Sequence, residues 1–182
     1  MKKNLLILMF ASLVINLSAQ KYITKNGYIY FFSETPVEDI KADNFNVSSV
    51  LDASTGDLVF KVPMKSFEFE KKLMQEHFNE NYVESEKFPD ASFKGKITNL
   101  EEVNFSEEGR YKAIVEGKLT IHGVTRDIKS EGQIDVAGGK VYARSTFYLS
   151  PEDYGIEIPS IVRNKIAKSI LISVDMKYES MQ

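Results

Sequence analysis

The chain of 182 residues contains no cysteine, and this absence removes several kinds of chemistry at once. Disulfide bonds, a thiol nucleophile and attachment of a lipid to a cysteine are all excluded. Histidine is scarce too: only His77 and His122 are present, far apart and without the spacing of a metal site. We therefore expect no metal centre and no cysteine-based catalysis.

Motifs of common enzymes are also missing. No Gly-x-Ser-x-Gly nucleophile elbow occurs, and no glycine-rich phosphate loop stands between a strand and a helix. Lysine and arginine form no continuous stripe, so nucleic acid is not an expected partner. These absences predict a protein that is not an enzyme and that has no catalytic residues and no cofactor.

The long hydrophobic run of the chain lies at its N-terminus. Lys2 and Lys3 precede the apolar residues 5–15, and the small residue Ala19 precedes polar sequence, which is typical of a secretory signal peptide. The run is shorter than the roughly 20 residues that a transmembrane helix needs, although an uncleaved anchor is the alternative. We expect cleavage after Ala19, and a periplasmic or secreted protein with no stable membrane span.

The mature chain would be residues 20–182, which is 182 less 19, or 163 residues. This is an ordinary size for one domain with one core. The 23 Lys and Arg less the two of the leader leave 21 against 26 Asp and Glu, a net charge of −5.

Alternation of apolar and polar residues, the pattern of half-buried strands, dominates the mature chain. It predicts about eight strands from nine alternating segments, at residues 28–32, 45–51, 57–62, 66–70, 91–97, 112–121, 124–136, 141–149 and 169–178. Residues 71–83 instead carry apolar groups at helical spacing and predict one short helix. Residues 154–168 read as a long loop with room for one helical turn.

Residues 112–136 predict a long hairpin whose turn is centred on Gly123 and Val124. A two-residue loop of the Gly-X kind suits a type II′ turn. It would pair Leu119 with Ile128 and Ile121 with Arg126. Both apolar sets then fall on one face, as the register of a half-buried hairpin requires.

Alternating strands of this kind close into a barrel or stack as a sandwich, and the pattern alone does not separate the two. Many inward positions are small, and this favours a barrel with a lumen, since eight strands enclose just enough space for side chains or one small ligand. The small inward residues are Ser49, Ala91, Gly95, Ala113, Gly117, Ser130, Gly132, Ala143 and Ser145. The alternative is that inward phenylalanines fill the space, as in an ordinary core.

The sequence pattern leaves more than one environment for the polar side chains of Arg126 and His122, and a third polar residue, His77, is considered with them. Arg126 shares the inward face, where an unpaired guanidinium is costly, so it reaches solvent at the barrel mouth, pairs with a carboxylate or meets the polar end of a ligand. His122 faces outward beside the turn, where it bonds to Thr125 or to backbone, or else stands at the rim near a ligand head group. His77, in the helical segment, is expected to pack partly buried.

Three segments resemble the YceI-like family of bacterial polyisoprenoid-binding proteins. Residues 117–126 resemble its hairpin motif, residues 77–93 its central helix-to-strand block, and residues 153–156 its Asp-[Phe/Tyr]-Gly-Ile loop. The segments occur in the family's order, and the similarity spans roughly residues 28–179. Where the family's first strand often carries a His-Ser element, this chain has Asn26 and Gly27.

The resemblance implies an eight-stranded antiparallel lipocalin-like barrel with an internal apolar cavity. It also implies an amphiphilic ligand, a polyisoprenoid or a fatty-acid-like lipid, held by an exported lipid-binding protein. A non-enzymatic interaction module with a packed core and function in its loops is the alternative, and a homodimer stays open. The candidate wall and mouth residues are Phe31, Phe45, Phe60, Phe67, Phe93, Leu119, Ile121, Arg126 and Phe147.

Overall fold

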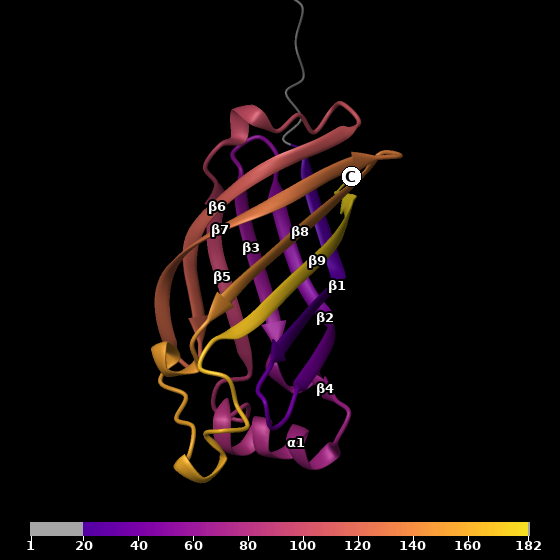
Figure 1. The fold of residues 1–182 in the computed structure, drawn as a ribbon. Coiled ribbons are helices and arrows are strands. Elements are labelled where there is room, and N and C mark those ends of the chain that lie inside the picture. The colour runs from indigo at the N-terminus through magenta and orange to yellow at the C-terminus, as the bar shows by residue number, and fades with distance from the viewer. Residues whose placement is uncertain (1–19, 182) are drawn as a thin grey trace, which may run out of the picture.

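The computed structural model describes residues 20–181 as one antiparallel sheet that closes on itself (Figure 1). The predicted signal peptide, residues 1–19, lies outside the described residues. The strands are β1 (Lys21–Ser33), β2 (Ile40–Asp52), β3 (Asp57–Pro63), β4 (Glu68–Phe69), β5 (Asp90–Ile97), β6 (Gly109–Ile121), β7 (Val124–Ala137), β8 (Lys140–Leu149) and β9 (Ile170–Ser180).

Eight of these strands form the barrel wall in the order β1-β9-β8-β7-β6-β5-β3-β2, and the pairing of β1 with β2 closes the ring. β4 is two residues long and only extends the edge of β2. The predicted eight-stranded antiparallel barrel is therefore confirmed, and the sandwich is excluded because one continuous ladder connects the wall.

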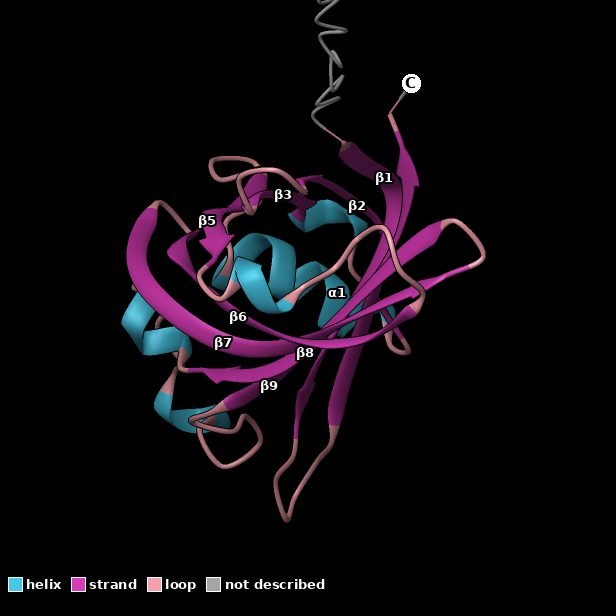
Figure 2. Ribbon diagram, turned by 90° about the horizontal axis from the view of Figure 1, so that it is seen from above, coloured by secondary structure: helices cyan, strands magenta, loops and turns pink. Residues whose placement is uncertain are grey.

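The predicted helix is present as α1 (Lys72–His77), which continues into the π-helical turn η2 (Phe78–Tyr82). Seen along the barrel, α1 lies across one end, while both ends of the described chain lie at the other (Figures 1 and 2). His77 is exposed, so its predicted burial is wrong. The short 3₁₀ turns are η1 (Met64–Ser66), η3 (Leu100–Glu102), η4 (Pro151–Tyr154) and η5 (Ser160–Val162).

The barrel end that carries the termini is filled by a packed core. Leu51, Met176 and Tyr178 are fully buried there. The Ser49 hydroxyl donates to the Val59 carbonyl at 2.9 Å, so the Tyr178 hydroxyl is the donor in its 2.7 Å contact with Ser49. Burial raises the pKa of Tyr178, which keeps the phenol neutral. Leu51 borders both this packed core and the cavity described below, so the core closes the lumen at this end.

A β-bulge in β2 overturns one predicted cavity residue. Phe45 and Asn46 are consecutive exposed residues opposite a register shift in β1, so inward-facing positions change from Asn44 to Val47. A bulge adds one residue to a strand and moves the following side chains to the other face. Phe45 is therefore outside the barrel, 54% exposed and stacked on Tyr28 with ring centroids 4.8 Å apart.

The β6–β7 hairpin turns at His122 and Gly123, not at Gly123 and Val124. Both turn residues have positive φ, 51° and 74°, as a type I′ turn requires, so the predicted type II′ turn is wrong. Ile121 pairs with Val124, and Leu119 pairs with Arg126. The register is shifted by two residues from the prediction, and because the side-chain period is two, each residue keeps its predicted face.

Candidate functional site

The barrel encloses a largely apolar cavity of about 610 Å³ that extends from the α1 end as far as Leu51, Leu58 and Ile97. Seven of the nine predicted wall and mouth residues line it: Phe31, Phe60, Phe67, Phe93, Leu119, Ile121 and Phe147. The two that do not are Phe45, for the reason given above, and Arg126. Which of these residues contact a ligand stays a prediction.

Phenylalanines form the floor of the cavity next to α1. The Phe31 ring lies 5.4 Å from Phe67, 5.6 Å from Phe69 and 5.5 Å from Phe78, between ring centroids. Phe78 comes from η2, so this cluster ties the helical segment to β1 and β4. Such tilted and edge-on pairs stabilise by about 0.5–1.5 kcal/mol beyond their buried area. At this end the aromatics do fill space, as the packed-core alternative expected.

The small inward residues serve two different purposes. Gly95 and Gly117 are cross-strand partners, and a Cβ on either would lie within 2.7 Å of the tip of the Phe93 ring, so these glycines make room for that ring. Others border open space, as the lumen prediction expected. The small residues on the cavity wall are Ala91, Ala113, Ser130, Gly132, Ala143 and Ser145.

Charged residues stand where the cavity opens beside α1. The Lys71 ammonium donates to the Glu38 carboxylate at 2.7 Å, and the pKa of Glu38 is lowered, first by this bond and further by the charges of Lys71 and Lys165. All three residues border the cavity. Sequence reasoning missed this group, because Glu38 precedes β2 and Lys71 precedes α1, and only folding brings the two loops together.

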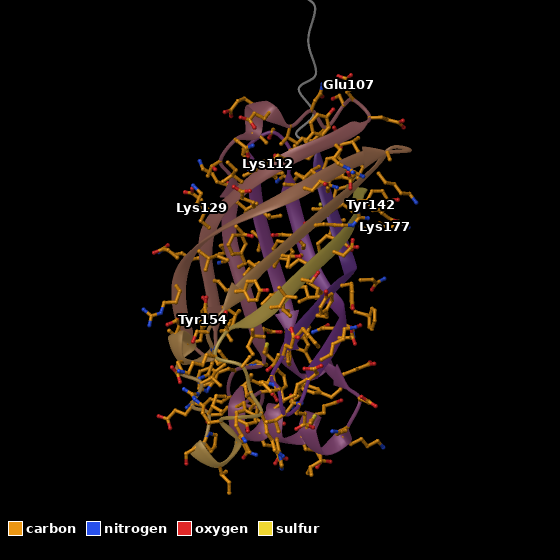
Figure 3. The ribbon with its side chains drawn as sticks, in the orientation of Figure 1. Glu107, Lys112, Lys129, Tyr142, Tyr154 and Lys177 are labelled. Carbon is orange, nitrogen blue, oxygen red and sulfur yellow. The ribbon has the colours of Figure 1, made fainter. Side chains whose placement is uncertain are left out.

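The three sequence motifs meet at one point of the barrel rim. His122 Nε2 lies 2.6 Å from a carboxylate oxygen of Glu84, and His122 Nδ1 lies 3.3 Å from the Tyr154 carbonyl. Both partner atoms, a carboxylate oxygen and a carbonyl oxygen, are hydrogen-bond acceptors. The bond to His122 is the first cause that lowers the pKa of Glu84. Figure 3 shows Tyr154 at this end of the wall.

Arg126 belongs to the same rim contacts. Its Nε donates to the Asp153 carbonyl at 2.8 Å, and its side chain is exposed, so it reaches solvent and bonds to backbone instead of to a carboxylate. His122 was expected to bond to Thr125 or to backbone: the backbone alternative is confirmed by its contact with the Tyr154 carbonyl, while Thr125 bonds to Thr120 at 2.8 Å. The rim contacts therefore join the hairpin tip, the segment after η2 and the η4 turn.

The rim stores backbone strain. Glu84 and His122 are the two non-glycine residues with positive φ, 44° and 51°, among residues 20–181. Each such conformation costs on the order of 1–3 kcal/mol and persists only where the surroundings impose it. Here the two strained residues bond to each other, and Gly123 is required beside them because a Cβ would lie 2.6 Å from the Phe88 ring.

Residues 20–181 show neither a metal-binding cluster nor a helix suited to crossing a membrane. His, Asp and Glu side chains there form no group of three that would hold a metal ion. Within the same residues, no helix combines the length and hydrophobicity needed to cross a membrane.

The family model of the YceI-like domain matches residues 30–178. The chain belongs to the YceI-like family. The match covers the barrel wall except residues 21–29 of β1 and the last two residues of β9, and it includes the three motifs that meet at the rim. No curated protein shows significant similarity to the sequence.

Solved structures share the YceI-like fold. A polyisoprenoid-binding domain from Saccharophagus degradans, implicated in plant cell wall breakdown, has a TM-score of 0.77 at 13% identity and covers 90% of this chain and 99% of its own. BcnA of Burkholderia cenocepacia has a TM-score of 0.69 at 14% identity, covering 84% and 96%. A Campylobacter jejuni YceI protein has 0.60 at 19%, covering 78% and 84%. At these identities the likeness extends to the fold alone.

Proposed function

We propose that this protein binds an amphiphile with a long isoprenoid or acyl chain and holds that chain in the barrel cavity, away from water. The observation that carries the proposal is the apolar cavity of about 610 Å³, to which nearly every wall strand contributes. Engineered apolar cavities of about 150 Å³ stay dry and bind small hydrocarbons, so a space this large is suited to a longer chain. The solved neighbour described as polyisoprenoid-binding supports the same ligand class.

Burial of apolar area supplies the affinity. Each buried methylene contributes about 0.8 kcal/mol, so a chain of about fifteen carbons contributes roughly 12 kcal/mol before costs. Ordering a flexible chain and losing its translational freedom offset several kcal/mol of this. The remainder corresponds to a Kd in the micromolar range, about −8 kcal/mol. Glu38, Lys71 and Lys165 then orient the polar head of the ligand at the opening.

We propose that the protein acts after export, in the periplasm or outside the cell. The support is the sequence of residues 1–19, with its basic start, its apolar run and the small residue Ala19. N-terminal sequencing of the protein recovered from the native host tests this. The expected first residue is Gln20, and an intact Met1 on cytoplasmic protein would contradict export.

A chain-length series tests the binding proposal. Purified, delipidated protein is titrated with linear isoprenols and with fatty acids of increasing length, followed by native mass spectrometry. Affinity is expected to rise with each added methylene until the cavity is full and then to level off. Failure of every chain to bind would contradict the proposal and favour an interaction module whose function lies in its loops.

A further inference from the structure

The barrel wall is not hydrogen-bonded along its full height. β7 pairs with β6 all the way to Val124, but its ladder with β8 covers only Gly132–Ala137 against Ser145–Lys140. Towards the α1 end, residues 124–131 of β7 and 146–149 of β8 have no pairing with each other (Figure 1). We call this unpaired stretch the β7–β8 seam.

Serine side chains replace backbone hydrogen bonds where the β7–β8 ladder ends. Glu131 would next bond to Thr146 if pairing continued, but its carbonyl accepts the Ser145 hydroxyl at 2.8 Å instead. The Ser130 and Ser145 hydroxyls are 2.7 Å apart, so a side-chain bond joins the strands where the backbone bonds stop. Because bonding alternates in an antiparallel ladder, backbone groups of Lys129 and Asp127 face the seam.

The seam is closed again at its lower end. The rim contacts from Arg126 to the Asp153 carbonyl and from His122 to the Tyr154 carbonyl hold the η4 turn against the start of β7. The unpaired stretch is therefore a bounded opening in the wall, with a ladder above it and the η4 turn below it. Lys129 lies on the β7 side of the seam, and its side chain projects from the outer face of the wall (Figure 3).

Both sides of the seam also line the cavity. Ile128 and Ser130 of β7 and Phe147 and Leu149 of β8 belong to the cavity wall. A hollow on the outer surface is lined by Glu131 and Thr146 at the top of the seam. Gly132, Gln133, Arg144 and Ser145 line the cavity and this hollow alike, so inside and outside meet there across two neighbouring cross-strand pairs.

We propose that the β7–β8 seam is a lateral entrance through which the apolar chain of the ligand passes into and out of the cavity. This rests on the proposed lipid binding. A chain that entered at the end of the barrel would pass α1 and the charged Glu38, Lys71 and Lys165, whereas the seam is flanked on its inner side by Ile128, Phe147 and Leu149. Apolar side chains keep water away from a passing apolar chain, so the route that they flank is favoured.

Reaction of single cysteines tests whether the seam opens, without any ligand. The native chain has no cysteine, and Val115 and Ser130 are cross-strand partners that both line the cavity. Ser130→Cys is expected to react with a bulky fluorescein maleimide roughly tenfold or more faster than Val115→Cys, a ratio that corresponds to about 1.4 kcal/mol. Equal rates, or faster reaction at Val115→Cys, would overturn the entrance.

A staple across the seam tests its use by the ligand. Lys129→Cys and Tyr148→Cys, both outward-facing, are joined by a short bismaleimide, and release of cis-parinaric acid to acceptor vesicles is followed by its fluorescence. Release is expected to slow by roughly tenfold or more, with the Kd unchanged. The matched control joins Lys118→Cys to Asp127→Cys, which already pair in the β6–β7 ladder, and should leave release unchanged.

The possible outcomes separate the two proposals. If the unstapled protein binds neither cis-parinaric acid nor an isoprenol, lipid binding fails and the seam loses its role as a ligand route. If the protein binds but the staple leaves the release rate unchanged, only the lateral entrance is overturned, and the ligand passes the α1 end.

Discussion

A larger side chain on the cavity wall distinguishes an open, ligand-binding lumen from a packed core. Ala143 of β8 lines the cavity, between its cross-strand partners Ile134 and Met176. Replacement by leucine adds three carbon atoms that project into the space a ligand chain would occupy. We therefore choose Ala143→Leu as the perturbation.

Ala143→Leu is expected to weaken ligand binding strongly while changing the stability of the apo protein little. In a packed core, added carbons cost about 1–3 kcal/mol, but in an open lumen Ala143→Leu should keep the free energy of unfolding of the apo protein within about 1 kcal/mol of wild type. The leucine takes the place of about three methylenes of ligand, at about 0.8 kcal/mol each. The binding free energy should therefore weaken by about 2.4 kcal/mol, which raises the Kd roughly fiftyfold.

Ala42→Leu is the matched control. Ala42 is fully buried and paired with Phe31 and Phe69, and it does not line the cavity. This variant should lose about 1–3 kcal/mol of stability. Urea unfolding of delipidated protein and titration with cis-parinaric acid measure both quantities. The reasoning is refuted if Ala143→Leu is destabilised as much as Ala42→Leu and binds as wild type does.

Four further substitutions test the wall contacts, the close approach of two glycines and the bond between Glu84 and His122. Phe60→Ala should weaken lipid binding several-fold through lost wall contacts while Phe45→Ala should not, and equal effects in a binding titration would contradict the outward placement of Phe45. Gly117→Ala forces a Cβ to within 2.4 Å of the facing backbone and should cost about 2–4 kcal/mol in urea unfolding; a near-neutral result would speak against this close approach. The pKa of Glu84 is lowered by its bond to His122, so this carboxylate stabilises the fold above its ordinary pKa of 4.5, and that contribution is lost as pH falls through the lower folded value. The stability advantage of wild type over Glu84→Gln should thus shrink below pH 4.5, and a pH-independent advantage would exclude the mechanism.

The faces of most strands could be predicted from sequence because an apolar lumen and a solvated outside impose strict alternation. Phe45 could not, since its segment keeps a perfect alternating pattern with Val47 and nothing in it marks the extra residue of the bulge. The register of the β6–β7 turn could not be predicted from the sequence either. Two registers gave the same faces, and the contacts of His122 with Glu84 and Tyr154, distant in sequence, are made in the one that forms.

The charged opening and the seam lay beyond sequence reasoning for a related reason. Glu38 meets Lys71, and the ladder between β7 and β8 stops at Ser145, only because of how the whole barrel curves and closes. The resemblance gave the family and the order of its motifs. It did not show that Glu84, His122 and Tyr154 come together, since motifs in linear order carry no distances.

Native mass spectrometry of the protein purified from its native host tests the central claim most directly. The account predicts a bound species with the mass of a single isoprenoid or acyl amphiphile, released by organic solvent and regained when that class of lipid is added back. A protein that carries no lipid and takes up neither an isoprenoid nor a fatty acid would contradict it.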